Sequence, residues 1–342
     1  MRVVVVDTDD YLDEAYERLR DTGPERDGWL SNHAPMAVEA LTRRGRGAVV
    51  HRWLDEYHDK LESRPRGLDR IHQDSWRDPL GDPLRTGDWL NFFEEEVRER
   101  DWREVLARWW PRLLPGIAAG ATHGVIRVGH AVRALADEET QPRVVELAHG
   151  LAYWAARWQP LAPAGEGPYG ANDPRSALDS VPRVADQRFG IRHRLAQLAV
   201  TDRWSEASGA VPGTGEIRER LASIVQASVL RYGTHGHGSP VMLVHASTAP
   251  NAVLRTLPEL PQRLWQPSLE AAWAATAAVT AAYSPSEPRP PSEHHLLDPE
   301  DVMSQAVAGG DEHAIKFVDT AIDFAEVPGV LDAGLHAIRL IA

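Results

Sequence analysis

The stretch Ala121-Thr-His-Gly-Val-Ile-Arg-Val-Gly-His-Ala-Val-Arg-Ala-Leu135 has the residue spacing of a buried helix. Apolar side chains recur along it at helical spacing, at Val125, Val128, Val132 and Leu135. His123 and His130 stand seven residues apart. Because a helix advances about 100° per residue, their imidazoles lie within about 20° of one face. The stretch therefore predicts a core helix that carries coordinating side chains inward.

The composition is that of a globular protein with ample material for a core. The chain has 342 residues, of which 43% are hydrophobic. Strand-like alternation is scarce, no long repeat is visible, and neither a P-loop nor a G-x-G-x-x-G segment after a strand occurs. We predict a mainly α fold, a single irregular helical domain over residues 1–342 with long loops rich in proline and glycine.

Charge and cysteine content exclude several functional classes. The formal net charge of -13 argues against a nucleic-acid partner, because phosphate binding requires clustered Lys and Arg. The sequence has no run of about 18 apolar residues and no secretory signal pattern, so we expect a cytoplasmic protein without a membrane partner. Cysteine is absent, so any metal must be held by His, Asp, Glu or a rarer ligand. The oligomeric state is left open.

The periodicity of apolar residues predicts further helices along the chain. They cover residues 12–20, 33–45, 48–61, 89–110, 142–158, 221–232, 241–254, 269–283, 299–308 and 310–324. Ser31 or Asn32 is the expected cap of the second and Asp311 that of the last. Segments 64–87, 161–186 and 205–216 are rich in proline, glycine and small residues and predict long loops, which often form the rims of sites. The valine run at residues 3–6 predicts a short strand or an extended arm.

Four histidines lie on apolar predicted helices or at their starts: His33, His123, His245 and His313. A single buried histidine is usually a hydrogen-bonded core residue. Four of them in a chain without cysteine make a histidine metal site an equally good interpretation. No H-E-x-x-H or other closely spaced signature is present, so the spacing alone leaves both interpretations open.

Lys316 is a second unusual residue, because the chain contains lysine only here and at Lys60. It follows His313 by three residues, so both project from one face of the predicted helix. Burial would lower its pKa, and the neutral amine could act as a base, form a Schiff base, or add carbon dioxide to become a carbamate, an anionic oxygen ligand. The alternative is an ion pair with Glu312 or Asp319 on the same helix.

A hydrolytic triad is a competing chemistry that the sequence supports poorly. Ser247 and Thr248 follow His245 closely and are possible nucleophiles. There is, however, no G-x-S-x-G elbow and no strand to hold one, so we do not favour hydrolysis.

Several segments, taken together and in order, resemble one known family. They are Ser31-Asn-His-Ala-Pro-Met36, Trp110-Pro-Arg-Leu-Leu-Pro-Gly116, Ala121-Thr-His-Gly-Val-Ile-Arg127 with His130-Ala-Val-Arg-Ala-Leu135, Leu151-Ala-Tyr-Trp-Ala-Ala156, His245-Ala-Ser-Thr-Ala-Pro250 and His313-Ala-Ile-Lys-Phe317. The sequence resembles the questin oxidase-like family, and the likeness extends over a core of about residues 13–325. That family includes fungal enzymes that oxidatively open a ring of anthraquinones during polyketide biosynthesis.

The resemblance implies an oxygenase with non-haem iron as its cofactor, because members are similar to enzymes whose iron is held by several histidines and a carboxylated lysine. Carried onto this sequence, the metal ligands are His33, His123, His245, His313 and Lys316. The expected partners are dioxygen and a small aromatic or quinone substrate, and Trp109, Trp110, Trp154 and Trp273 are candidates to line its pocket by stacking.

His130 and Arg127 are the candidate catalytic residues. His130 could orient a ligand, contact the substrate or replace His33 as a ligand, and Arg127 could bind a phenolate or quinone oxygen or pair with an acid. Two functions remain as alternatives to the iron oxygenase. One is a Baeyer-Villiger-type oxidase that uses NADPH as co-substrate, although no dinucleotide fingerprint is present. The other is a helical protein that binds a metal or an aromatic ligand without turnover.

Overall fold

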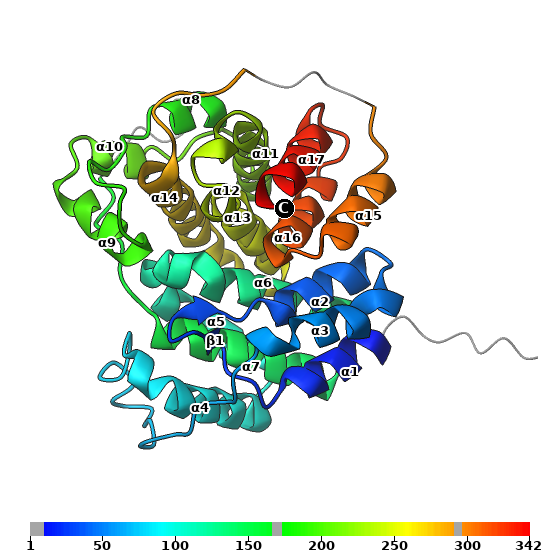
Figure 1. The fold of residues 1–342 in the computed structure, drawn as a ribbon. Coiled ribbons are helices and arrows are strands. Elements are labelled where there is room, and N and C mark those ends of the chain that lie inside the picture. The colour runs from blue at the N-terminus through cyan, green and yellow to red at the C-terminus, as the bar shows by residue number, and fades with distance from the viewer. Residues whose placement is uncertain (1–9, 166–172, 291–295) are drawn as a thin grey trace, which may run out of the picture.

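The computed structural model describes residues 10–165, 173–290 and 296–342, and within them the fold is an irregular assembly of α-helices (Figure 1). The α-helices are α1 (Asp10–Leu19), α2 (Ala34–Arg43), α3 (Val50–Tyr57), α4 (Thr86–Glu99), α5 (Trp102–Leu113), α6 (His123–Asp137), α7 (Gln141–Ala156), α8 (Pro174–Asp179), α9 (Ile191–Ala196), α10 (Trp204–Gly209), α11 (Ile217–His235), α12 (Pro240–Leu243), α13 (His245–Thr256), α14 (Trp265–Tyr283), α15 (Pro299–Gly309), α16 (Glu312–Ile322) and α17 (Val330–Ile341). The predicted mainly α fold is confirmed. The valine run at residues 3–6 and parts of the predicted loop 161–186 lie outside the described residues.

Short 3₁₀ helices and one hairpin complete the described elements. The 3₁₀ helices are η1 (Gly47–Val49), η2 (His58–Lys60), η3 (Pro83–Arg85), η4 (Leu114–Gly116), η5 (Ala119–Thr122), η6 (Gln197–Val200), η7 (Gly236–Gly238), η8 (Leu257–Glu259) and η9 (Gln262–Leu264). Strands β1 (Glu25–Arg26) and β2 (Leu30–Ser31) pair antiparallel, with Glu25 opposite Ser31. Asp27 and Gly28 between them have φ of 50° and 79°, the left-handed backbone that closes a tight hairpin.

Helix α6 lies at the centre of the fold, as its sequence predicts (Figure 1). It packs against α7 on one side and α13 on the other, and its residues from His123 to Leu135 are buried. Helix α2 contacts both α6 and α16, and α13 also contacts α16. The N-terminal helices and the C-terminal helices therefore meet around α6, and residues far apart in sequence come together there.

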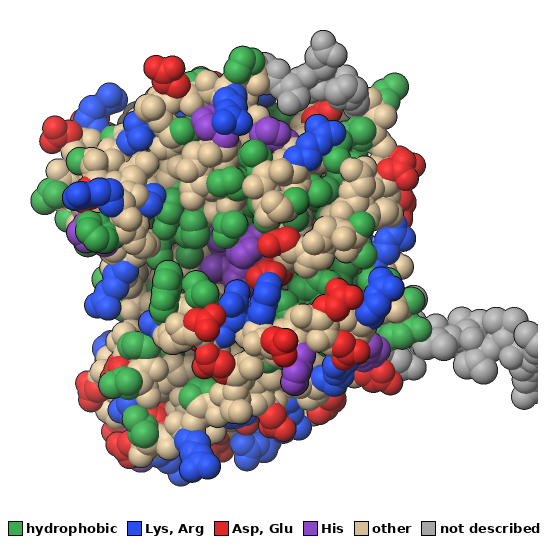
Figure 2. Space-filling view, viewed as in Figure 1, with side chains coloured by type: hydrophobic (Ala, Val, Ile, Leu, Met, Phe, Trp, Pro, Cys, Tyr) green, Lys and Arg blue, Asp and Glu red, His purple; other side chains and the backbone are tan. Residues whose placement is uncertain are grey.

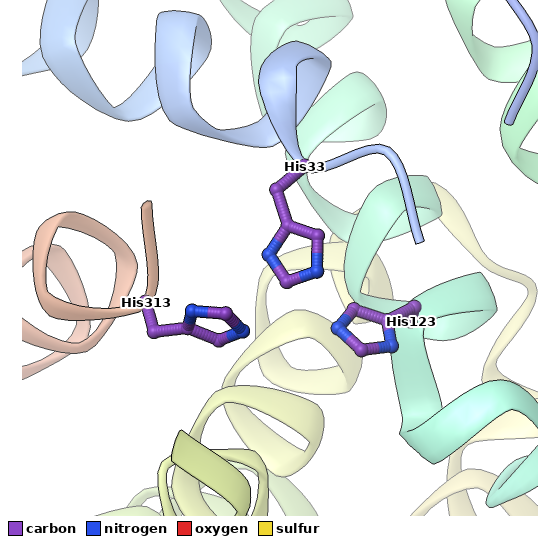
Figure 3. A group of neighbouring side chains, drawn as sticks. All are labelled: His33, His123 and His313. Carbon is purple, nitrogen blue, oxygen red and sulfur yellow. The ribbon is translucent and has the colours of Figure 1, made fainter. Parts of the chain in front are cut away.

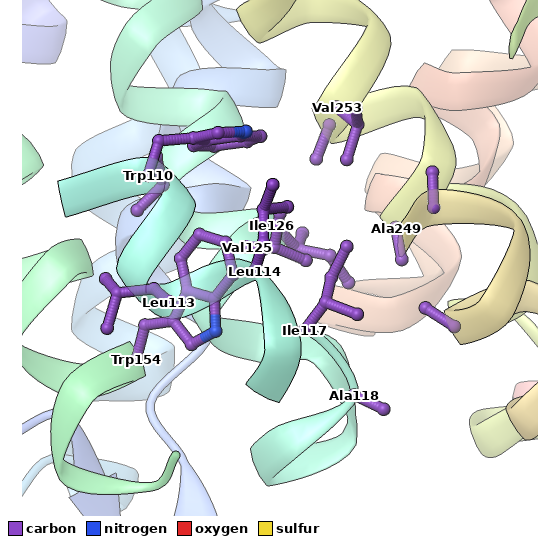
Figure 4. Close-up of a cluster of buried hydrophobic side chains, with 14 of the residues drawn as sticks. Trp110, Leu113, Leu114, Ile117, Ala118, Val125, Ile126, Trp154, Ala249 and Val253 are labelled. Atoms are coloured by element: carbon purple, nitrogen blue, oxygen red, sulfur yellow. The ribbon is translucent and has the colours of Figure 1, made fainter. Parts of the chain in front are cut away.

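A cluster of buried apolar side chains fixes the position of α6 (Figure 4). It includes Trp110 from α5, Val125 and Ile126 from α6, Trp154 from α7 and Val253 from α13. The rings of Trp110 and Trp154 pack edge to face, with their centroids 5.4 Å apart. The start of α6 is held by dense packing on three sides, which restricts the movement of the residues that it carries.

The structure corrects two predicted helices. The helix predicted over residues 89–110 is divided into α4 and α5, because Arg100 is extended and the Asp101 side chain caps α5 by accepting a hydrogen bond from the backbone N–H of Arg103. The helix predicted over residues 241–254 is divided into α12 and α13, so His245 begins a helix instead of lying in the middle of one.

Three further features were not expected from the sequence. The predicted loops 161–186 and 205–216 contain or adjoin the short helices α8 and α10, and α17 lies beyond the expected core.

Among the described helices, none combines the length and the apolar character needed to span a bilayer.

Candidate metal centre

Four histidines lie at the starts of four helices and come together beside α6. His33 is the N-cap of α2, and His123 and His245 are the first residues of α6 and α13. His313 is the second residue of α16. Figure 3 shows His33, His123 and His313 extending from three separate helices toward a common point. The chain brings together all four histidines that the sequence singled out.

The distances within this cluster are those of a coordinating group. The ring centroid of His33 lies 4.3 Å from that of His313 and 4.5 Å from that of His123. The Nε2 atoms of His123 and His245 are 2.9 Å apart. Ligand atoms of His33, His123 and His313 all lie within 4.8 Å of one another, which is close enough for one ion to contact them.

Backbone carbonyls fix the orientation of His123 and His245. The Nδ1 of His123 lies 2.5 Å from the carbonyl oxygen of Gly120, and the Nδ1 of His245 lies 3.0 Å from that of Met242. A carbonyl oxygen only accepts, so both imidazoles carry their proton on Nδ1 and present the lone pair of Nε2 to the cluster. His313 is held less directly, with its Nδ1 3.3 Å from a carboxylate oxygen of Asp311.

Lys316 is buried and extends into the same cluster, where its Nζ lies 2.9 Å from Nδ1 of His33. Burial lowers the pKa of Lys316 to about 8. The acids considered as alternative partners are engaged elsewhere, because Glu312 pairs with Lys60 and Asp319 pairs with arginines. Lys316 therefore has a larger neutral fraction at neutral pH than a lysine in water, while its ammonium form still predominates below pH 8.

The histidines of the cluster are held neutral. Burial, followed by the charge of Lys316, keeps the pKa of His33 and His245 well below the ordinary value of 6.5. Burial and the neighbouring His245 do the same to the pKa of His123. Neutral imidazoles are the form that binds metals, so the cluster is prepared for coordination at neutral pH.

The free energy of unfolding of the protein stripped of metal is expected to fall as the pH drops from about 7 to about 5. In this window the unfolded chain binds protons at histidines whose folded-state pKa lies below 6.5, so stability is lost as the pH falls. Urea denaturation at several pH values measures this slope. Replacing His245 by glutamine should make the slope shallower, and an unchanged slope in that variant would contradict the prediction.

The residues immediately before His123 adopt an unusual backbone. Gly120, Ala121 and Thr122 have φ of 55°, 56° and 66°, which places three consecutive residues in the left-handed region. This conformation costs about 1–2 kcal/mol for a residue with a Cβ, and a β-branched residue such as Thr122 is rarely found there. The turn aims the carbonyl of Gly120 at the ring of His123, so local strain contributes to the placement of a candidate ligand.

Replacing Ala121 by glycine is expected to be nearly neutral for stability. Relief of about 1–2 kcal/mol of left-handed strain offsets about 0.8 kcal/mol of lost methyl burial and about 0.5–1 kcal/mol of added backbone entropy. The same change at Ala131, which is buried within the regular part of α6, should cost about 2 kcal/mol. Chemical denaturation compares the two variants, and equal losses would show that the turn holds no strain.

The centre lies near one face of the molecule. The side chain of His313 is 13% exposed, while His33, His123 and His245 are buried. Figure 2 shows histidine side chains at the base of a hollow in this face, bordered by hydrophobic side chains on one side and by acidic and basic side chains on the other. Tyr57 stands beside the cluster and accepts a hydrogen bond from the backbone N–H of His33 at 3.2 Å. Small molecules therefore have a short path from solvent to the histidines.

His130 and Arg127, the candidate catalytic residues, are bound to glutamates and are separate from the histidine cluster in their contacts. The Nδ1 of His130 lies 2.5 Å from a carboxylate oxygen of Glu39. Arg127 donates two hydrogen bonds to Glu146, at 2.5 and 2.7 Å. Seven residues along a helix correspond to about 10 Å along its axis, which explains why His130 shares a face with His123 but reaches a different set of partners.

The tryptophans expected to line a substrate pocket form the core instead. Trp109, Trp110, Trp154 and Trp273 are almost completely buried. Their indole N–H groups donate to Glu96, Ser268, the Gly116 carbonyl and the Ala207 carbonyl respectively. These contacts leave the rings packed against protein rather than presented to a ligand.

Sequence reasoning missed the groups that orient the histidines. The carbonyls of Gly120 and Met242 belong to the backbone, and no side-chain pattern identifies them. Glu39 was also missed, although it is a carboxylate among the buried, otherwise apolar residues of α2 from Ala34 to Leu41, and that isolation is a usable signal. Asp311 was predicted as a helix cap, and it caps α16 and also lies beside His313.

Fold and cluster together define a helical protein with a candidate metal centre of four histidines and one lysine. The family model described as questin oxidase-like matches residues 30–321, and the chain belongs to this family. The matched region contains every residue of the candidate centre. Membership implies an oxidoreductase that acts on a small aromatic molecule. No curated protein matches the chain.

Proposed function

We propose that the protein is a non-haem iron oxygenase that oxidatively cleaves a ring of an aromatic polyketide or quinone. The contact between His123 and His245 carries this proposal. Their Nε2 atoms lie 2.9 Å apart while both Nδ1 atoms face backbone carbonyls, so two nitrogen lone pairs are held close together. Such a contact is repulsive on its own and becomes favourable when both nitrogens share a cation.

The donor set fits a divalent iron ion. Histidine nitrogens bind transition metals at about 2.0–2.1 Å. Two such nitrogens are therefore about 3 Å apart when the angle between them at the ion is about 90°. The measured 2.9 Å between the Nε2 atoms of His123 and His245 has this size. Imidazole and oxygen ligands suit Fe²⁺, and His33 and His313 would complete the nitrogen donors.

Lys316 would supply the oxygen ligand as a carbamate. Its neutral Nζ would form a bond to the carbon of carbon dioxide and release one proton, giving an N-carboxylate with a single negative charge. The pKa of about 8 increases the neutral fraction at neutral pH compared with a lysine in water. Helices α2, α6 and α16 all begin at the centre, and the positive ends of their dipoles favour a negative ligand there.

Bound iron would supply a site at which dioxygen binds and is activated, which an organic substrate alone does not offer. The protein's own groups would hold the ion and keep their imidazoles neutral. The hydrophobic border of the hollow would bind a flat aromatic ring and exclude water from it (Figure 2). His130 and Arg127 would not bind the ion or the substrate directly, because each is already bound to a buried glutamate.

The test is metal content combined with oxygen consumption. Protein expressed with iron supplementation should contain about one iron ion per chain and consume dioxygen with an anthraquinone or hydroquinone substrate. Protein without stoichiometric transition metal would contradict the proposal. NADPH oxidation by metal-free protein would support the Baeyer-Villiger-type alternative, and metal binding without turnover of any quinone would support a binding protein.

A further inference from the structure

A second layer of polar residues lies about two turns along the same four helices that carry the histidines. Each helix contributes one residue six or seven positions after its histidine: Glu39 on α2, His130 on α6, Asn251 on α13 and Asp319 on α16. All four side chains are buried. Since the helices are rigid over this distance, contacts in this layer fix the helix starts relative to one another.

Arg133 is the central cation of this layer. It donates to both carboxylate oxygens of Glu39, at 2.7 and 2.5 Å, and to both carboxylate oxygens of Asp319, at 3.2 and 2.9 Å. The same Glu39 carboxylate is bound by Nδ1 of His130 at 2.5 Å. One arginine and two acids thereby join α2, α6 and α16.

Arg255 extends the layer to α13. It donates to Asp319 at 2.8 Å and to Asp323 at 2.6 Å. Asn251, also on α13, donates to Asp323 at 3.0 Å. Arg44, immediately after α2, donates to the Asp319 carboxylate at 2.8 Å and also binds Asp323. Helix α16 is thus joined to each of α2, α6 and α13 by hydrogen bonds between charged groups.

The charges of the layer balance, so each buried charge in it has an opposite charge as a partner. Three arginines face three carboxylates. Burial lowers the pKa of His130 by more than the hydrogen bond to Glu39 raises it, so this ring is neutral. Burial alone would raise the pKa of Glu39, but Arg133 and His130 lower it to about 2. Removing one carboxylate would therefore leave a buried positive charge uncompensated.

We propose that this layer is a positioning device for the metal centre, in which Glu39 and His130 set the distance between the starts of α2 and α6. This inference rests on the proposed function, because it assigns the layer's role through a bound metal. A metal centre tolerates ligand displacements of only about 0.2 Å, so small shifts between helices weaken binding. His130 is then a positioning residue that acts through Glu39, and neither a ligand nor a substrate contact.

The layer is itself poorly suited to hold a second metal. Ligand atoms of Glu39, His130 and Asp319 lie within 4.8 Å of one another, which resembles a metal site. Arg133, however, bonds both carboxylates, and a cation placed between them would have to displace the guanidinium. Charge compensation is already complete, so a helix-joining role explains these contacts better.

Glu39→Gln and Glu94→Gln form a matched pair for the test. Glu94 on α4 binds His149 on α7 at 2.7 Å and also binds Arg64, so it has one histidine and one arginine as partners, as Glu39 does. The pKa of Glu94 is also lowered to about 2, against the effect of burial. Helices α4 and α7 carry no residue of the candidate centre.

Cobalt(II) titration of the full-length protein, followed by visible absorption, measures the affinity of the centre. The Glu39→Gln variant should bind cobalt about 10- to 100-fold more weakly than wild type, while the Glu94→Gln variant stays within about threefold. Thermal unfolding of the stripped variants reports whether each one folds. A folded Glu39→Gln variant with wild-type affinity, or an equal loss in both variants, would overturn the inference. A wild type that binds neither cobalt nor iron would instead overturn the proposed function.

A second pair keeps the inference testable where Glu39→Gln does not fold. His130→Asn places an amide N–H near the position of Nδ1 and should retain affinity within about threefold, whereas His130→Leu fills the space without a donor and should lose at least about tenfold. Equal retention by both variants would show that the hydrogen bond has no positioning role. Equal loss by both would indicate that the ring itself is a ligand, which would also overturn the inference.

Discussion

Replacing His123 or His245 by alanine is expected to lower bound iron from about one ion per chain to less than about one tenth, and ring cleavage with it. The Nε2 atoms of the two residues lie 2.9 Å apart, and the Nδ1 of each ring lies at a backbone carbonyl, so both Nε2 lone pairs are available to one ion. Alanine removes a donor that no neighbouring side chain can replace. Elemental analysis of the purified variants gives the metal content directly.

His149→Ala is the control for these two variants. His149 is also a buried histidine, but its ring binds Glu94 between α7 and α4 and lies outside the cluster. Its removal should lower stability while the bound iron stays near the wild-type amount. A His123→Ala or His245→Ala protein that keeps a full complement of iron would show that our ligand assignment is wrong.

Incubation with ¹³C-labelled bicarbonate is expected to give a carbamate resonance in the wild-type protein that is absent from Lys316→Met. The chain has only two lysines, so the assignment has a natural control in Lys60→Met. The side chain of Lys60 is 43% exposed and pairs with Glu312, and its replacement should leave the resonance in place. Carbon-13 NMR of the three proteins makes the comparison. A resonance that survives in Lys316→Met would locate any carbamate elsewhere.

The yield of this carbamate in the metal-stripped protein should rise with pH through about 8. Only the neutral amine reacts with carbon dioxide, and burial lowers the pKa of Lys316 from the ordinary 10.5 to about 8. Lys316 is a base whose pKa is lowered on folding. Its neutral form therefore predominates above pH 8 in the folded chain, but only above pH 10.5 in the unfolded chain. A midpoint near 10.5 would show that Lys316 is not desolvated.

The sequence predicted the helical class and most helices, because their apolar residues recur with a clear period. It failed where two helices follow each other without a long loop. Asp101 ends the continuity between α4 and α5 as a cap, yet a single aspartate among charged neighbours gives a weak signal. Helix α17 was not predicted, although apolar residues recur along Val330–Ile341.

The candidate site was predictable in its members and unpredictable in its geometry. His33, His123, His245, His313 and Lys316 were found because the family segments and the rarity of lysine marked them. Their distances depend on long-range packing between α2, α6, α13 and α16, which no local pattern encodes. The same limit applies to His130. Its spacing from His123 predicted a shared face, but its partner Glu39 lies 91 residues earlier in the chain.

The left-handed turn at Gly120, Ala121 and Thr122 has a consequence for the order in which the centre is assembled. Isolated chain segments do not hold three such residues, so His123 reaches its final orientation only when packing around the start of α6 is complete. The other members of the centre are contributed from positions between 33 and 316. During refolding, helix formation should therefore precede metal uptake by a measurable delay, and metal capture would mark the last step of folding instead of nucleating it.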